Sequence, residues 1–153
     1  MFTRKLVNRL RMPIRHVLVC EDVLRNQAEI ASHFEDLFAH EGEVQVSFVC
    51  GAEAAAAILS SMPVDLILLD HDMPFGDGPE LLKWMGTRGV SAPVITFSGI
   101  PENNDRLVRC GAKHRFEKGD VIRGRADDLI KALLGLPLVQ DNDGKKRRGS
   151  ARS

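Results

Sequence analysis

Five short apolar runs, separated by longer amphipathic stretches, constrain the fold of this chain more than any other feature. The runs predict strands at residues 14–20, 44–49, 66–69, 94–97 and 115–117. The third run is apolar throughout, which is typical of a parallel strand that is covered on both faces. Strands that alternate with helices in this way predict a doubly wound α/β fold with a five-stranded parallel sheet and helices on both faces.

The amphipathic stretches predict five helices, which lie around residues 30–38, 54–59, 79–85, 107–108 and 129–134. In the first of them Ile30 and Phe34 recur at helical spacing, and Pro79 suits the first turn of the third. No internal repeat interrupts the pattern. We therefore expect one domain over residues 14–136.

The two ends differ from this domain in charge. Lys plus Arg and Asp plus Glu number 21 each, but residues 1–15 carry five basic and no acidic side chains. Residues 137–153 carry five basic and two acidic ones. Because the body between them is acidic, no direct DNA binding is expected.

Residues 1–13 form a basic N-terminal extension in which Phe2, Leu6 and Leu10 are spaced four apart. This extension is either a short amphipathic helix or a frayed end. The tail 137–153 is polar and basic without apolar periodicity, so we expect it to be disordered. It is also too short for an output domain.

Composition places the chain among globular proteins, with 44% hydrophobic and 27% charged residues. No apolar run approaches the roughly 20 residues of a membrane span, and no signal peptide is evident, so we expect a cytoplasmic protein. Cys20, Cys50 and Cys110 are too few and too scattered for a zinc site or a disulfide framework. We interpret them as small core residues in a reducing compartment.

Polar side chains follow four of the expected strands, at the edge where open parallel sheets bind ligands. They are Glu21, Asp22, Asp70, His71, Asp72, Ser98 and Lys118. Acids this close raise one another's pKa unless a cation intervenes, and a hard divalent ion such as Mg²⁺ meets that need. With Mg²⁺ present, Asp70 can attack a phosphoryl group while Ser98 and Lys118 hold the transferred oxygens.

The motifs at this edge identify a family. The chain resembles the receiver domain of two-component response regulators over residues 14–136. The matching segments are HVLVCED (16–22), LILLDHDMPFGDG (66–78), PVITFSG (93–99), CGA (110–112) and FEK (116–118). The resemblance implies a flavodoxin-like fold with strand order 2-1-3-4-5.

The resemblance also implies roles for the polar residues. Asp70 would be the phospho-acceptor, Asp22 would bind Mg²⁺ directly, and Glu21 would help through water. The backbone carbonyl of Asp72 would complete the metal site. Ser98 would be the switch hydroxyl, and Lys118 would contact the phosphoryl group. The protein would then be no enzyme beyond self-phosphorylation and slow autodephosphorylation.

The partners implied are a sensor histidine kinase or a histidine phosphotransfer protein as phosphoryl donor, and an unknown downstream protein target. Without an output domain, the signal would pass through protein contacts or a phosphorelay. A homodimer would use the face formed by the helix at 107–108, strand 115–117 and the helix at 129–134.

Three departures from the family pattern concern the response to phosphorylation. Gly119 follows Lys118 where the family usually has proline, and Arg115 occupies the position of the aromatic switch residue. We expect an Arg115 that pairs with an acid to replace that residue as a switch. The span from Ser98 to Gly111 is also slightly shorter than usual.

Two other functions remain open. Asp70, His71 and Asp72 resemble the D-x-D motif of haloacid-dehalogenase-type phosphatases, although that motif normally follows the first strand rather than the third. A pseudo-receiver that only binds partners is the second alternative, kept open by Arg115 and Gly119. The side chain of His71 points away from that of Asp70 in an extended backbone, so we expect a packed or solvent-facing histidine rather than a metal ligand.

Overall fold

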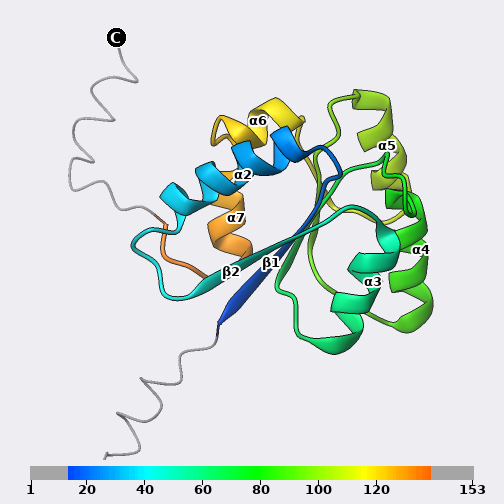
Figure 1. Cartoon of the computed structure of the whole chain (residues 1–153), viewed down its shortest axis with the longest axis horizontal. Coiled ribbons are helices and arrows are strands. Elements are labelled where there is room, and N and C mark those ends of the chain that lie inside the picture. The colour runs from blue at the N-terminus through cyan, green and yellow to red at the C-terminus, as the bar shows by residue number, and fades with distance from the viewer. Residues whose placement is uncertain (1–13, 139–153) are drawn as a thin grey trace, which may run out of the picture.

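The computed structural model describes residues 14–138, so the predictions for residues 1–13 and 139–153 lie outside the described part. Five strands form one parallel sheet in the order β2-β1-β3-β4-β5 (Figure 1). The strands are β1 (Arg15–Cys20), β2 (Val44–Val49), β3 (Leu66–Leu69), β4 (Val94–Thr96) and β5 (His114–Arg115). The predicted fold class and strand order are confirmed.

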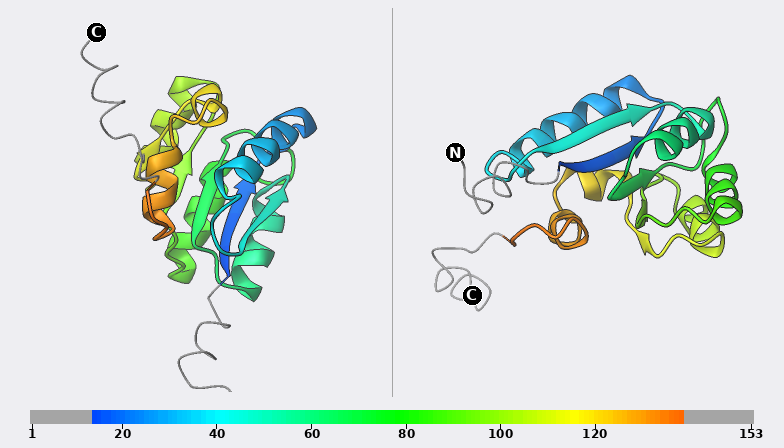
Figure 2. Two further views of the ribbon diagram at one scale, coloured as in Figure 1. Left: turned by 90° about the vertical axis from the view of Figure 1, so that its left-hand side faces the viewer. Right: turned by 90° about the horizontal axis from the view of Figure 1, so that it is seen from below.

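Six helices of the described chain cover the two faces of this sheet (Figures 1 and 2). They are α2 (Leu24–Leu37), α3 (Ala52–Ser61), α4 (Gly78–Arg88), α5 (Pro101–Arg109), α6 (Lys118–Ile122) and α7 (Asp127–Leu133). Buried side chains of α2, α6 and α7 pack on one face, and those of α3, α4 and α5 pack on the other. Within residues 14–138, no helix is long and apolar enough to cross a bilayer.

The structure corrects the prediction for the last strand and the helix after it. Strand β5 covers His114–Arg115 instead of residues 115–117. The carbonyl oxygen of Phe116 accepts a hydrogen bond from the Asn104 side chain at 3.1 Å, so the chain leaves the sheet there. The five-residue helix α6 begins at Lys118 and was not predicted, because it is too short to show apolar periodicity.

The interpretation of the cysteines as core residues is correct for Cys20 and wrong for the other two. Cys20 is buried in β1, whereas Cys50 and Cys110 are exposed. Cys50 directly follows the last residue of β2, and Cys110 is the C-terminal cap of α5. Both therefore lie where an element turns away from the core. All three are free thiols.

The loop between β3 and α4 is shaped by residues that the family resemblance rests on. The side chain of Asp77 caps α4 by accepting a hydrogen bond from the amide of Glu80 at 2.9 Å. Gly78 lies against the backbone of Asp70, where an added Cβ would come within 2.5 Å of the Asp70 carbonyl oxygen. A side chain at position 78 would push the start of α4 away from the end of β3.

Candidate functional site

The register of the central strands brings three acids together. Cys20 of β1 pairs with Leu69 of β3, so the residues that follow them, Glu21 and Asp70, lie at the same edge of the sheet. The amide of Asp70 donates to the carbonyl oxygen of Cys20 at 3.1 Å. Carboxylate oxygens of Glu21, Asp22 and Asp70 all lie within 4.8 Å of one another. The acidic cluster predicted from strand order is therefore present.

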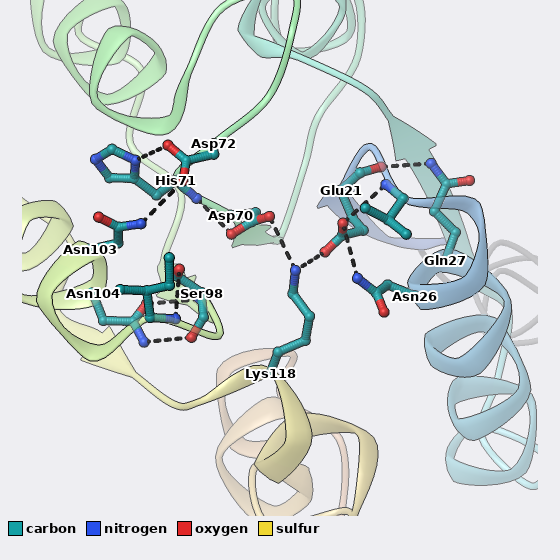
Figure 3. Close-up of polar contacts among 12 residues, drawn as sticks. Glu21, Asn26, Gln27, Asp70, His71, Asp72, Ser98, Asn103, Asn104 and Lys118 are labelled. Atoms are coloured by element: carbon teal, nitrogen blue, oxygen red, sulfur yellow. Dashed lines mark hydrogen bonds and ion pairs between the residues drawn. The ribbon is translucent and has the colours of Figure 1, made fainter.

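Lys118 reaches into this cluster from the start of α6 (Figure 3). Its Nζ lies 2.6 Å from Glu21 Oε2 and 3.1 Å from Asp70 Oδ2. The same ammonium lies 5.5 Å from the centre of the Phe97 ring, within the range of a cation–π contact. Only 17% of the Lys118 side chain is exposed, so this ammonium is the buried counter-ion of the two acids.

Glu21 is fully buried and is held by the start of α2 (Figure 3). Its Oε1 accepts hydrogen bonds from the amide of Val23 at 3.1 Å and from Asn26 Nδ2 at 3.4 Å. Gln27 Nε2 donates to the Glu21 carbonyl oxygen at 2.6 Å. Sequence reasoning missed Asn26 and Gln27, because polar residues in the first turns of a helix are common without a function.

Burial raises the pKa of Asp70, and the charge of Glu21 raises it further, while Lys118 and the amide of His71 act in the opposite direction. For Lys118, burial alone would lower the pKa. Its contacts with Glu21 and Asp70 outweigh burial, and the pKa is raised. Burial, with the charge of Asp70 as a smaller cause, also raises the pKa of the Cys20 thiol, so this cysteine stays protonated.

The donor set of the triad fits a hard divalent cation. All its ligand atoms are carboxylate oxygens, which Mg²⁺ prefers to nitrogen or sulfur. Asp22 is only half-buried, and a hollow lined by Asp22, Asp72 and Asp77 opens beside the cluster. That hollow gives water access to the acids, and Mg²⁺ usually keeps several water ligands.

His71 and Asp72 form a pair beside the triad. The ring of His71 is buried and points away from the triad, with Nδ1 at 2.7 Å from Asp72 Oδ1 (Figure 3). Asp72 Oδ2 accepts a hydrogen bond from Asn103 Nδ2 of α5 at 3.2 Å. The side chain of Asp72 is 72% exposed, so it lies at the mouth of the site. His71 is a packed residue, as expected, and contributes its amide to Asp70 Oδ1 at 2.8 Å.

Ser98 is buried in the loop after β4, and its hydroxyl accepts a hydrogen bond from the amide of Ile100 at 3.2 Å. The fully buried side chain of Asn104 holds this loop. Asn104 Oδ1 accepts from the Ser98 amide at 2.9 Å, and Nδ2 donates to the Ser98 carbonyl oxygen at 3.0 Å. The same Nδ2 donates to the carbonyl oxygen of Phe116 at 3.1 Å. One side chain thus joins the serine loop to the segment that leads into Lys118.

Arg115, the last residue of β5, contacts helix α5 and lies outside the acidic cluster. It forms an ion pair with Asp105, and its NH2 lies 3.5 Å from the carbonyl oxygen of Pro101. About half of its side chain, 45%, is exposed. The predicted pairing of Arg115 with an acid is confirmed. Its role as a switch stays a prediction.

Comparison with known proteins agrees with this geometry. The sequence pattern of the response regulator receiver domain matches residues 17–119. Two-component response regulator ORR41 of Oryza sativa subsp. japonica is 36% identical over 104 residues, which are 67% of this chain and 68% of that protein. The TorCAD operon transcriptional regulatory protein TorR of Escherichia coli O157:H7 is 31% identical over 93 residues. That match covers 61% of this chain but only 38% of TorR.

A solved structure has the same fold. The receiver domain of sensor histidine kinase PA1611 from Pseudomonas aeruginosa PAO1, described with a magnesium ion coordinated in the active site cleft, superposes with a TM-score of 0.63. The match covers 80% of this chain and 99% of that one, at 20% identity. At this level of identity the likeness concerns the fold alone.

Proposed function

The chain belongs to the response regulator receiver domain family, and on this premise we propose that Asp70 is its phospho-acceptor. The observation that carries the proposal is the arrangement around this carboxylate. Oxygens of Glu21 and Asp22 lie within 4.8 Å of it, and Lys118 Nζ lies 3.1 Å from its Oδ2. A carboxylate with a cation site on one side and an ammonium on the other is suited to nucleophilic attack on phosphorus.

The donor in the proposed reaction is a phosphohistidine of a sensor histidine kinase or a histidine phosphotransfer protein. Asp70 forms the new P–O bond while the P–N bond of the donor breaks. The electron pair stays on the imidazole nitrogen, which takes a proton from water. Lys118 stabilises the transferred oxygens, and the hydroxyl of Ser98 turns from Ile100 towards them.

The acidic triad is of the kind that holds Mg²⁺ in receiver domains. We assign direct ligation to Asp22 and Asp70, a water-mediated contact to Glu21, and a further ligand to the backbone carbonyl of Asp72. When bound, Mg²⁺ supplies positive charge next to the phosphoryl oxygens. The fold holds the carboxylates in place for the ion, because both loops that carry them directly follow central strands of the sheet.

Membership of the receiver family makes the chain a signalling domain rather than a catalytic enzyme, which excludes the phosphatase alternative. A receiver implies a partner kinase or phosphotransfer protein. We propose that its signal leaves through contacts with a downstream protein or through a phosphorelay, with a homodimer through α5, β5 and α7 as one such contact. Three free thiols support a cytoplasmic location, where thiols stay reduced.

The experiment that tests the proposal uses beryllofluoride, which mimics an aspartyl phosphate, together with Mg²⁺. In amide NMR spectra of the full chain we expect shifts at Asp70, Ser98 and Lys118 that go beyond those caused by Mg²⁺ alone, and none when beryllofluoride is added without Mg²⁺. A small acyl phosphate with Mg²⁺ should add one phosphoryl group per chain, stable in acid and labile in base. Unchanged spectra together with no phosphoryl uptake would favour the pseudo-receiver alternative.

A further inference from the structure

A groove that shares no lining residue with the acidic cluster lies between helix α2 and the edge strand β2. It has a volume of about 460 Å³. Its apolar lining includes Phe34 of α2, the C-terminal cap residue Phe38, and Val44, Val46 and Phe48 of β2. Figure 1 shows β2 at the outer edge of the sheet with α2 above it.

The groove exists because one face of the edge strand is incompletely covered. Val17 and Val19 of β1, on the same face, are fully buried. Their partners in the register, Val46 and Phe48 of β2, are only partly buried. Strands of a parallel sheet are normally covered on both faces. This part of the sheet therefore has an apolar surface that one more amphipathic element would cover.

The rim of the groove is acidic. Glu35 of α2 and Glu43 before β2 line it, and the lining contains no basic side chain. Both glutamates are exposed, and no side-chain partner of either is found among the described residues. The neighbouring Glu41 differs, since Lys131 Nζ lies 3.2 Å from its Oε1. A ligand of this groove would present an apolar stripe flanked by positive charge.

The extension before β1 has that chemistry and is tethered at the groove. The amide of Arg15 donates to the carbonyl oxygen of the groove residue Glu43 at 3.1 Å. Arg15, the first residue of β1, therefore lies next to one end of the groove. The apolar stripe of residues 1–13 is Phe2, Leu6 and Leu10. Lys5 and Arg9 follow the first two of these by three residues, so in a helix they flank the stripe.

The lengths also agree. Eleven residues of helix span about 16 Å, and the five β2 residues from Val44 to Phe48 span about 16 Å as a strand. Pro13 disfavours the helical conformation at Met12, so a helix would end before this pair. Residues 12–14 would then make the turn that reverses the chain between the groove and β1.

We propose that residues 1–11 form an amphipathic helix that docks in this groove. Phe2, Leu6 and Leu10 cover the exposed face of β2, and the basic residues beside them pair with Glu35 and Glu43. Because the segment is tethered, its effective concentration at the groove is in the millimolar range. A contact that is weak between separate molecules is then sufficient for docking. This proposal does not depend on the chemistry of Asp70.

The test places a spin label on the polar side of the extension. Asn8→Cys is made in the full chain with Cys50→Ser and Cys110→Ser, which leaves only the buried Cys20 as a second thiol. We expect amide signals of Ala31, Glu35 and Val46 to lose most of their intensity, while those of Gly86 in α4, on the other face of the sheet, are retained.

Two matched sets of variants show whether the contact is the one proposed. Leu6→Asp with Leu10→Asp should restore the groove signals, and so should Glu35→Lys with Glu43→Lys. The control is Glu53→Lys with Glu102→Lys, which reverses two exposed acids on helices of the other face and should leave the signal loss unchanged.

Four results would overturn the proposal. The first is full signal intensity in the groove of the labelled chain. The second is signal loss that survives Leu6→Asp with Leu10→Asp. The third comes from mixing isotope-labelled chains that carry no spin label with chains of natural isotopic abundance that carry it. Signal loss in this mixture would place the extension on a second copy of the chain. The fourth is signal loss that survives Glu35→Lys with Glu43→Lys, which would rule out the charge pairing at the rim.

Discussion

The two halves of the site are held together in different ways. The acids follow β1 and β3, and β1 pairs with β2 through six residues and with β3 through four. Lys118 comes after β5, which pairs with β4 through only two residues. Backbone hydrogen bonds therefore fix the half that carries Asp70. Side chains, namely Asn104 and the Arg115–Asp105 pair, hold the half that carries Ser98 and Lys118.

Because of this difference, one half of the site carries the phosphorylation chemistry and the other half carries the conformational response. Parts of a fold with few backbone hydrogen bonds open and shift more easily than central strands do. A phosphoryl group on Asp70 would contact both halves of the site. Only the half that carries Ser98 and Lys118 is loosely enough held to change conformation in response. The departures at Arg115 and Gly119 also fall in that half. Substitutions in the responding segment can therefore change the conformational response and leave the acceptor site around Asp70 unaltered.

The largest effect is expected from Asp70→Asn, which removes the proposed nucleophile from the rigid half. Phosphoryl uptake from an acyl phosphate should fall to zero, as measured by intact-mass spectrometry. Asp72→Asn is the matched control, because that carboxylate is mostly exposed and pairs with His71 outside the triad. Uptake in the control should persist, with a changed rate of dephosphorylation if Asp72 limits the access of water. Uptake in Asp70→Asn would place the acceptor elsewhere.

Lys118→Met should lower both the stability of the protein and the rate of phosphorylation, since it removes the counter-ion that joins the two halves of the site. Glu21 is fully buried, so its uncompensated charge should lower the free energy of unfolding by about 3 kcal/mol. Loss of one donor to the transferred oxygens should slow phosphorylation on the order of 10²-fold. Thermal unfolding and phosphorylation kinetics measure the two effects.

Mg²⁺ distinguishes this account of Lys118 from a purely structural one. Added Mg²⁺ should raise the melting temperature of Lys118→Met more than that of the wild type, because it compensates the same acids. Lys113→Met serves as control, since Lys113 is exposed and lies outside the acidic cluster. An equal response to Mg²⁺ in all three proteins would count against the shared site.

Asn104→Ala tests the link between the serine loop and β5. It leaves the buried backbone groups of Ser98 and the carbonyl oxygen of the partly buried Phe116 without their partner, which should cost about 1–3 kcal/mol of unfolding free energy. Beryllofluoride should still shift Ser98, but the shift at Phe116 should shrink. Asn103→Ala is the control, because its side chain donates a hydrogen bond to the exposed Asp72 and none to the serine loop or Phe116 among the described residues. Equal shifts at Phe116 in both variants would show that the response travels by another route.

Arg115→Ala should give the smallest effect on stability. Its ion pair with Asp105 is about half exposed, and such pairs contribute less than about 1 kcal/mol. Phosphoryl uptake should be unchanged, whereas the beryllofluoride-induced shifts of α5 should decrease. A cycle with Asp105→Ala isolates the pair by urea denaturation. If α5 responds normally in all members of the cycle, Arg115 is no switch.

The half of the site that carries Asp70 was more predictable from the sequence than the half that carries Ser98 and Lys118. The strands at Val44–Val49 and Leu66–Leu69 have the predicted bounds, because an alternating apolar pattern defines the first and a continuous apolar run defines the second. The acids were predictable for the same reason, since they directly follow such strands. The bounds of the short β5 and of α6 were not predictable. They depend on contacts between residues far apart in the sequence, Asn104 with Phe116 and Lys118 with Glu21, and local apolar periodicity carries no information on such contacts.

Asn104 is the clearest case. In the sequence it is one of two asparagines in a polar helix, and its neighbour Asn103 carries the same side chain. Only the fold shows that one is fully buried and the other contacts the surface residue Asp72. The exposed Cys50 and Cys110 teach the same lesson, because an apolar neighbourhood in the sequence does not fix burial at the end of an element.

The count of charges at the acidic cluster has a consequence for the order of events. Three carboxylates and one ammonium leave a surplus of two negative charges at the edge of the sheet. A phosphoryl donor is itself an anion, and it would meet repulsion there. Productive encounters then require the divalent cation to arrive first. Under the proposed function, phosphorylation of Asp70 would require bound magnesium however abundant the phosphoryl donor is. The magnesium concentration would then control whether the signal can begin.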